Sequence, residues 1–201
     1  MPAKPIVHVV IHSFYGHTKT LGEAIVAGLE SEGAVAKLFR VPETLPAEVL
    51  AKMHAATFDN IPVITPDDLT KADGFLFGFG GRFGGAPAQV KAFWDSTGGL
   101  WATGALAGKF GGAFTSTATQ HGGQETNIFS FLPNYVHHGI IFVPLGFGPK
   151  GISGVDEVTG GTPWGASAIA DSNGSRAVTE REKQIAKEQG IAFAKTLKRL
   201  A

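Results

Sequence analysis

The feature that most constrains the fold is a near-continuous run of β-branched residues at positions 6–12. Such a run predicts a strand that is buried on both faces, as in a parallel sheet. Beyond a short polar turn, Leu21, Ile25 and Leu29 recur at helical spacing up to Gly33, which suits a helix C-cap. A buried strand followed by an amphipathic helix is the repeating unit of α/β proteins.

This alternation continues along the chain, so we predict a doubly wound parallel sheet with right-handed crossovers and helices on both faces. The 201 residues form one domain, 1–201, with five strands. Residues 146–175 are rich in Gly, Ser, Thr and Pro and are expected to be a long inserted loop, which is usually functional. Strands are predicted at 6–12, 35–41, 74–79, 110–117 and 140–145, and helices at 21–33, 47–53, 88–96, 126–136 and 179–200, the last opened by a Thr179–Glu182 capping box.

Composition removes several classes of function. Seventeen basic and seventeen acidic residues leave no positive surplus for nucleic acid, and the absence of cysteine excludes disulfides, thiolate nucleophiles and cysteine-based metal centres. His137 and His138 are adjacent, without the i, i+4 spacing of a helical metal site, so no metal is expected. The longest apolar stretch, 139–147, is too short to span a bilayer, and no targeting segment is visible, so we expect a cytoplasmic protein.

Three glycine-rich loops follow predicted strands, at 13–18, 79–85 and 116–124. Doubly wound sheets bind ligands beyond the carboxyl ends of their strands, so these loops are the candidate site. The hydroxyl groups and N–H groups of residues 13–18 suit a phosphate at a helix N-terminus. No G-x-G-x-x-G fingerprint is present, which favours a monophosphate over a pyrophosphate. The alternative is an ordinary turn in which Thr18 caps the helix.

The other loops suit a flat, polar ring. Arg82 and Phe83 can border such a ring and hydrogen-bond its carbonyl groups; the alternative is a salt-bridged surface arginine and a core phenylalanine. Residues 116–125 offer small side chains and amides, and His121 either contacts a ligand or lies on the surface. Trp101 follows two glycines and is either a stacking platform or a core or subunit contact.

Taken together, these segments resemble the WrbA family, the flavodoxin-like type IV NAD(P)H:quinone oxidoreductases, including fungal members. The resemblance extends in the family's order from about residue 6 to the C-terminal helix. It is carried by SFYGHT (13–18), RFG (82–84), FWDSTGGLW (93–101), GGQE (122–125), HHG (137–139) and GGTPWG (160–165).

The resemblance implies a flavodoxin-like fold, one FMN per subunit, NADH or NADPH as electron donor, a quinone as acceptor, and a homotetramer. Tyr15 would also receive the nicotinamide nucleotide, Trp101 would form a wall of the quinone pocket, and His137, the candidate catalytic residue, would reach the flavin from beside a neighbouring subunit. The phosphate would be held by Ser13, Phe14, Tyr15, Gly16, His17 and Thr18, and the isoalloxazine by Gly81, Arg82, Phe83, Ser116, Thr117, Ala118, Thr119, Gln120 and His121.

Two segments depart from the family pattern. Family members usually carry Thr-Pro-Thr before Arg-Phe, where this chain has Phe79, Gly80 and Gly81; replacing Pro with Gly costs about 1 kcal/mol of loop entropy. Gln120 and His121 replace a glycine pair. The first hypothesis is therefore an FMN-dependent NAD(P)H:quinone oxidoreductase, and the alternative is a non-enzymatic stress or scaffold protein that binds FMN weakly. A one-electron carrier, usually strongly acidic, fits this neutral chain less well.

Overall fold

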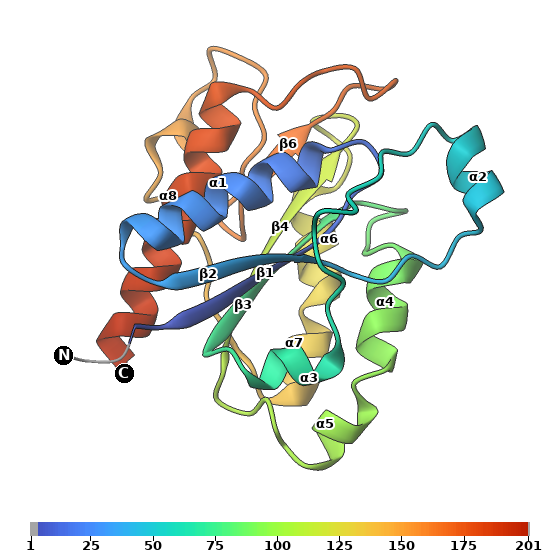
Figure 1. The fold of residues 1–201 in the computed structure, drawn as a ribbon. Helices are drawn as coiled ribbons and strands as arrows, with labels where there is room; N and C mark the ends of the chain where they lie inside the picture. The colour runs from blue at the N-terminus through green and yellow to red at the C-terminus, as the bar shows by residue number, and fades with distance from the viewer. Residues whose placement is uncertain (1–3, 201) are drawn as a thin grey trace.

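The computed structural model of the chain describes residues 4–200, which fold around one parallel sheet (Figure 1). The strand order is β2-β1-β3-β4-β5, and a sixth strand, β6, also pairs with β4. The chain runs from β1 to β2 on one side and then crosses to β3 on the other, so the strand order switches between β1 and β3. The strands are β1 (Ile6–His12), β2 (Val35–Arg40), β3 (Gly74–Gly80), β4 (Phe110–Thr117), β5 (Ile141–Phe142) and β6 (Ser167–Ile169).

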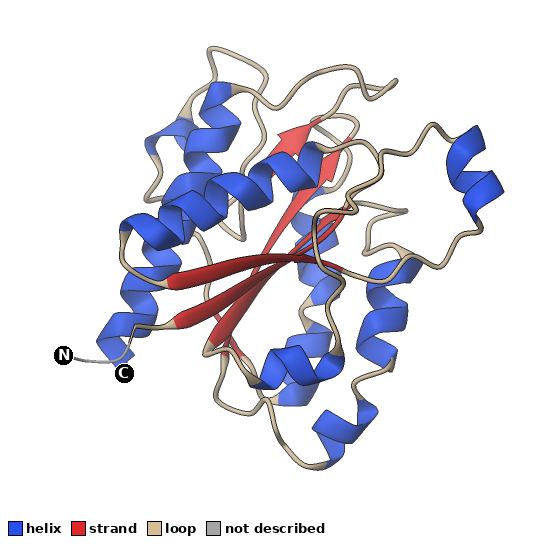
Figure 2. Cartoon of the chain, in the orientation of Figure 1, coloured by secondary structure: helices blue, strands red, loops and turns tan. Residues whose placement is uncertain are grey.

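Helices cover both faces of the sheet, as predicted (Figures 1 and 2). One face carries the first and last helices, and the other carries the helices between β3 and β5. The helices are α1 (His17–Ser31), α2 (Ala47–Lys52), α3 (Pro66–Thr70), α4 (Ala88–Asp95), α5 (Gly98–Ala102), α6 (Gln124–Phe131), α7 (Pro133–His138) and α8 (Glu180–Leu200), with a 3₁₀ helix, η1, at Lys150–Ser153.

β1 is buried on both faces, as its composition predicts. Val7, Val9 and Ile11 belong to the hydrophobic cluster under α1 and α8, whereas Val10 belongs to the cluster on the opposite face. The second cluster is markedly aromatic and packs Phe75, Phe77, Phe79, Phe93, Trp94, Phe131 and Tyr135 together. Residues that alternate along one strand therefore join the two cores and fix the position of its carboxyl end, where the first loop begins.

α1 and α8 cross at very close range. A Cβ atom on Gly28 would lie 2.1 Å from the backbone oxygen of Lys187, and one on Gly190 would lie 2.2 Å from the backbone oxygen of Ile25. Both positions therefore require glycine. The crossing joins the C-terminal helix to the helix that follows the first loop.

The sheet has six strands rather than the five predicted, because the segment 146–175, expected to be a long loop, contains a strand. This segment contains η1 and β6, and β6 pairs with the carboxyl half of β4 at Thr115, Ser116 and Thr117, whereas β5 pairs with its amino end at Phe110 and Gly111. Two short strands thus fill the fifth place in the sheet, and the segment between them is an insertion into it. β6 has only three residues, Ser167–Ile169, which is too short to show a periodic pattern in the sequence. It is a strand because it pairs with β4, which is distant in the sequence.

The predicted helix at 126–136 is two helices, α6 and α7, which meet at Leu132. Pro133 opens α7 and has no N–H with which to continue the hydrogen bonds of α6. The capping-box prediction is confirmed, since the Thr179 N–H donates to Glu182 Oε2 at 2.9 Å and the Glu182 N–H donates to Thr179 Oγ1 at 3.2 Å.

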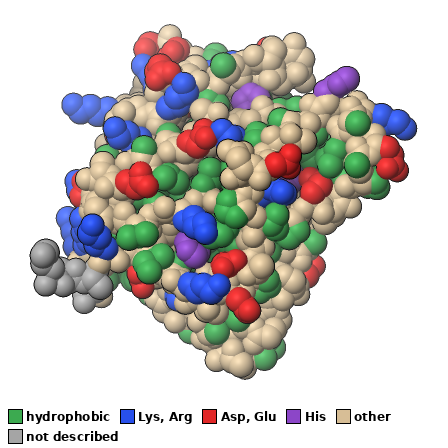
Figure 3. Space-filling model, in the orientation of Figure 1, with side chains coloured by type: hydrophobic (Ala, Val, Ile, Leu, Met, Phe, Trp, Pro, Cys, Tyr) green, Lys and Arg blue, Asp and Glu red, His purple; other side chains and the backbone are tan. Residues whose placement is uncertain are grey.

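Basic and acidic side chains are interspersed over the face of the molecule shown in Figure 3, in keeping with the balanced charge. Among residues 4–200, no helix is both long enough and apolar enough to cross a membrane.

Candidate functional site

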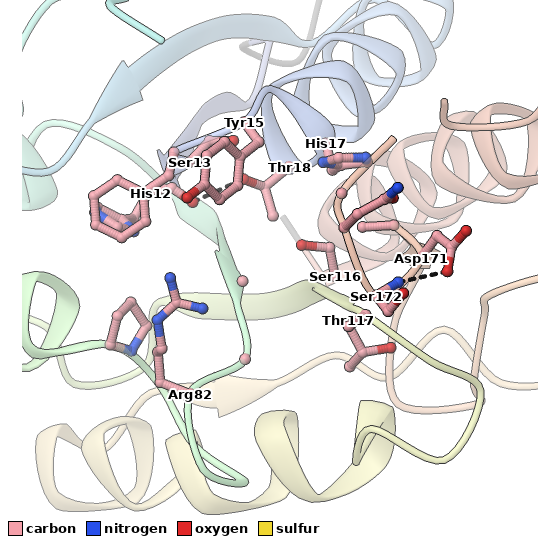
Figure 4. A pocket seen from close by; sticks show the side chains of 18 residues that line it. His12, Ser13, Tyr15, His17, Thr18, Arg82, Ser116, Thr117, Asp171 and Ser172 are labelled. Atoms are coloured by element: carbon pink, nitrogen blue, oxygen red, sulfur yellow. Dashed lines mark hydrogen bonds between the residues drawn. The ribbon is translucent and has the colours of Figure 1, made fainter. Parts of the chain in front are cut away.

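A cavity of about 300 Å³ lies at the carboxyl ends of β1, β3 and β4, beside the switch in strand order (Figure 4). All three predicted loops reach it. The predicted residues that line it are Ser13, Phe14, Tyr15, His17, Thr18, Gly81, Arg82, Ser116, Thr117 and Ala118; the others are His12, Gly80, Pro87, Ala170, Asp171, Ser172, Asn173 and Gly174.

The first loop ends in a left-handed turn at Gly16, with φ +92°, which is the N-cap of α1. The Gly16 N–H donates to Ser13 Oγ at 3.0 Å, which leaves the Ser13 hydroxyl hydrogen for another acceptor. The first N–H groups of a helix have no acceptors within it and form a site for an anion. Donors from the Ser13 hydroxyl and the start of α1 therefore converge on one end of the cavity.

Thr18 is not the helix cap that the alternative interpretation required. It lies inside the first turn of α1, buried, and its hydroxyl donates to the carbonyl of His12 at 2.7 Å. The Thr18 hydroxyl therefore joins the start of α1 to the end of β1, and its hydrogen is already used. The hydroxyl best placed to donate to a ligand in this loop is that of Ser13.

The second loop presents its backbone and Arg82. The Gly81 N–H donates to the Ser116 carbonyl at 2.9 Å, and the Arg82 guanidinium lies 5.4 Å from the centre of the Phe14 ring. Phe83 is fully exposed and does not line the cavity, so within this chain it cannot border a ring bound there. The alternative, a phenylalanine in the core, is also wrong. Phe79 is buried and does not line the cavity. The centres of its ring and of the Phe131 ring lie 5.2 Å apart.

Asn127 supports this loop from behind. Its side chain is fully buried, and both the nitrogen and the oxygen of its carboxamide lack a partner within the described residues. A Cβ atom on Gly81 would lie 2.0 Å from Asn127 Nδ2, so the carboxamide occupies the space that a side chain at position 81 would need. An unpaired buried amide is costly, and it marks a place where a polar group is expected beside the loop.

The third loop reaches the cavity only through its first three residues. Thr119, Gln120 and His121 are exposed and do not line it. The Thr117 hydroxyl donates to the Thr119 carbonyl at 2.8 Å, which turns the chain away from the cavity at this point.

A fourth wall, residues 170–174, was not predicted to be part of the site. It follows β6 and faces the first loop across the cavity. The His17 Nε2–H donates to the carbonyl of Arg176 at 2.9 Å, which ties this segment to the start of α1. The signal for it in the sequence was the run Asp-Ser-Asn-Gly inside the segment that was expected to be a loop.

Glu182 holds the fourth wall in place. Its carboxylate is fully buried and accepts hydrogen bonds from the N–H groups of Gly160 (2.9 Å), Ile169 (3.1 Å) and Thr179 (2.9 Å). The guanidinium of Arg176 donates to the same carboxylate at 2.9 Å. The capping residue predicted from the sequence is therefore also the anchor of a cavity wall.

Trp101 and His137 lie elsewhere. They line a separate surface cavity of about 470 Å³ between α4, α5 and α7, together with Trp94 and His138, and none of its lining residues belongs to the first cavity. Trp101 is 60% exposed, so it is a surface residue of this chain rather than a core residue. His138 Nε2 lies 2.9 Å from the Thr97 hydroxyl.

Comparison with known proteins agrees with this geometry. The Flavodoxin family model matches residues 9–131, and the chain belongs to this family. NAD(P)H quinone oxidoreductase PST1 of Candida albicans is 53% identical over 191 residues, covering 95% of this chain and 96% of the relative. An NAD(P)H dehydrogenase (quinone) of Gluconacetobacter diazotrophicus is 45% identical over 193 residues, covering 96% and 97%.

The fold also matches a solved structure, the flavodoxin, WrbA-like protein from Agrobacterium tumefaciens. The TM-score is 0.67 at 22% identity, and the match covers 98% of this chain and 99% of that one. The resemblance to the WrbA family and the flavodoxin-like fold are thereby confirmed.

Proposed function

We propose that this chain is an NAD(P)H:quinone oxidoreductase that uses FMN bound in the cavity at the ends of β1, β3 and β4. The observation that carries the proposal is the convergence there of the α1 N-terminus, the Ser13 hydroxyl and the walls formed by the second and third loops. The names of relatives about half identical over nearly the whole chain support the same activity.

The residues present fit FMN in two respects. The oriented donors at the start of α1 suit a dianionic monophosphate without any lysine in the cavity wall. Arg82, Ser116 and Thr117 line the cavity with polar groups that suit the polar edge of the flavin ring. Ser13, the turn at Gly16 and the first turn of α1 would hold the phosphate, and Gly81, Arg82 and Ser116–Ala118 would border the ring.

When bound, FMN would supply hydride transfer between NADH or NADPH and a quinone that binds in turn at the same site. The chain itself binds and orients the reactants. The Arg82 guanidinium and the loop N–H groups stabilise negative charge that develops at the ring. Tyr15, 53% exposed at the rim, offers a surface for the nicotinamide nucleotide.

In this proposal, Trp101 and His137 contribute to the flavin site of a second subunit. They line a cavity of their own, so they reach a flavin site only when another copy of the chain places them there. The proposed assembly is the homotetramer that the family resemblance implies, with Trp101 as a wall for the quinone and His137 beside the ring. Phe83, fully exposed at the end of the second loop, is available for the same contact.

Two measurements test the proposal. Added FMN should lose its fluorescence on binding, and anaerobic NADH or NADPH should then bleach its visible absorbance, which a quinone restores. Persistence of the absorbance with both nucleotides would contradict the reductase function.

The alternative, a scaffold protein with weak FMN binding, rested on the departures at 79–81. Phe79 packs in the core, so its side chain removes nothing from the cavity. A protein that leaves FMN fluorescence unquenched would support that alternative instead.

A further inference from the structure

His12, the last residue of β1, lies between two cavities. It lines the main cavity and also a smaller one of about 140 Å³, formed by the ends of β1 and β2 and by residues 55–59. Ala56, Thr57 and Asp59 line the smaller cavity and are exposed, so that cavity opens to solvent. His12 itself is only 6% exposed.

A carboxylate is fixed beside this histidine. Glu43 Oε1 accepts hydrogen bonds from the N–H groups of Thr44 (2.8 Å) and Leu45 (2.9 Å) and from Gln89 Nε2 (2.7 Å). Glu43 Oε2 lies 3.4 Å from His12 Nε2, which is buried and has no hydrogen-bond partner. Three donors on one oxygen therefore hold the other oxygen toward the imidazole ring.

The remaining neighbours of the ring are an aromatic side chain and a cation. Phe14 packs edge-on, with ring centres 4.6 Å apart and an interplanar angle of 86°. Arg82 lies over Phe14 and, in Figure 4, reaches from the second loop toward His12. The charged groups facing His12 are thus Glu43 from the loop after β2 and Arg82 from the loop after β3, and Arg40 and Asp59 line the smaller cavity with it.

These surroundings set the acidity of His12. Burial lowers its pKa below the usual 6.5 and the positive charge of Arg82 acts in the same direction, whereas Glu43 opposes both. For Glu43, burial alone would raise the pKa, but the hydrogen bonds from Leu45, Gln89 and Thr44 outweigh it and the pKa is lowered. The carboxylate therefore stays charged when the imidazole takes up a proton.

Quinone reduction needs one proton in addition to the hydride. Four other ionisable side chains line the main cavity. Tyr15 and Asp171 are exposed to solvent, Arg82 does not release a proton at ordinary pH, and the Nε2–H of His17 is donated to the Arg176 carbonyl. His12 differs from all four, because it is buried, has a carboxylate beside it and borders a cavity that opens to solvent.

We propose that His12 is the proton donor for quinone reduction and that Glu43 is the residue that positions it. This inference rests on the proposed function. The quinone receives a hydride, which carries the electron pair, and a proton from the His12 imidazolium; the products are the hydroquinone and neutral His12. Because Nε2 faces Glu43 and keeps its hydrogen, the proton leaves from Nδ1, and solvent returns a proton to Nδ1 after the hydroquinone has left.

The first test uses the flavin-free protein. Nuclear magnetic resonance titration of the imidazole signals should show a lower pKa for His12 in Glu43→Gln than in the parent, because the opposing negative charge is lost. His8 is the internal control, since it is a buried histidine on the same strand that lines neither cavity. An unchanged His12 pKa in Glu43→Gln would overturn the role of Glu43.

The second test separates the two halves of the reaction by rapid mixing at pH 6. His12→Gln should leave the rate of flavin bleaching by NADH or NADPH unchanged and slow reoxidation by a quinone about 100-fold, the usual scale of general acid catalysis. The parent's reoxidation rate should fall as pH rises through the pKa of His12, and Glu43→Gln should move that fall to lower pH. His8→Gln is the matched control with the parent's profile, and thermal melting of each variant identifies any loss of fold.

The outcomes distinguish this inference from the proposed function. If neither nucleotide bleaches the parent protein, the proposed function fails. If the parent is bleached and reoxidised normally but folded His12→Gln keeps the same reoxidation rate and pH profile, the role of His12 is wrong. His12→Phe, which has no polar group at this position, repeats the test should His12→Gln prove unstable.

Discussion

Two cavities of this chain are built in different ways. The main cavity is formed where strands end, largely from backbone groups and small side chains of segments far apart in the sequence. The cavity that holds Trp101 and His137 is formed mostly by side chains on α4, α5, α6 and α7, and Gly85 and Ala86 at the end of the second loop border it. Sheet topology brings strand-end loops together within one chain, whereas in the proposed assembly Trp101 and His137 would reach that site from another copy. Variants that affect one cavity and not the other test this division.

The largest effect is expected at the wall of the main cavity. Glu182→Ala should lower the free energy of unfolding by about 3–5 kcal/mol, because it leaves Arg176 without its buried carboxylate. The variant should also weaken FMN binding, since residues 170–174 lose their anchor. Chemical denaturation and FMN titration measure the two effects. Glu180→Ala, an exposed residue in the same helical turn, is the control and should change stability by less than about 0.5 kcal/mol.

A smaller effect is expected behind the second loop. Gly81→Ala should cost about 1–3 kcal/mol, because the new methyl group meets the Asn127 carboxamide. Adding Asn127→Ala should recover part of that loss, which a double-mutant cycle in denaturant measures. Gly80→Ala is the control, since its Cβ would lie 3.4 Å from the nearest side-chain atom, Ser116 Oγ. Equal losses for both single glycine variants would contradict the pairing of Gly81 with Asn127.

In the cavity that holds Trp101 and His137, we expect a substitution to change quinone binding and not the stability of the fold. Trp101→Ala should raise the KM for quinone about tenfold, the scale of one lost aromatic contact, while stability stays the same because the side chain is exposed. FMN affinity should be unchanged. Steady-state kinetics and FMN titration check these points, and Phe147→Ala, another exposed aromatic residue, is the control. A weakened affinity for FMN would show that Trp101 acts on the cofactor site rather than on the quinone.

The smallest effect is a pH dependence of stability. Burial lowers the pKa of His8 and of His12 below 6.5, so the unfolded chain binds more protons than the folded chain as pH falls. Stability is therefore fully present above pH 6.5 and is lost below it, by about 1.4 kcal/mol per pH unit for each extra proton bound. His8→Gln should flatten this slope in denaturant titrations between pH 7 and about 5. An unchanged slope would mean that His8 titrates alike in both states.

Much of the main cavity followed from the sequence because its determinants are local. Apolar runs located β1 and β3, and the turn residues that follow each strand indicated where a ligand would bind. Residues 170–174 and β6 were missed because they acquire their places from distant partners, Glu182 and β4. His12 was counted only as part of a strand, since nothing local shows that Glu43 lies beside it.

The sequence could not predict, for a different reason, that Phe83, His137 and Trp101 lie outside the main cavity. A motif shared with a family reports that residues act together, but not whether one chain or two supply them. The loop at 79–85 turns Phe83 into solvent at a backbone φ of +50°, and α5 and α7 carry the other two residues to a separate surface. The structure is needed to show that these three residues lie outside the cavity formed by the strand-end loops.

The central claim is that FMN is held by its phosphate at the start of α1. A crystal structure of the protein grown with FMN tests it directly. The claim predicts phosphate oxygens within hydrogen-bonding distance of the Ser13 hydroxyl and of N–H groups in the first turn of α1, with the ring between the loops after β3 and β4. A phosphate bound anywhere else, or a ring in the cavity of Trp101 and His137 from the same chain, would contradict it.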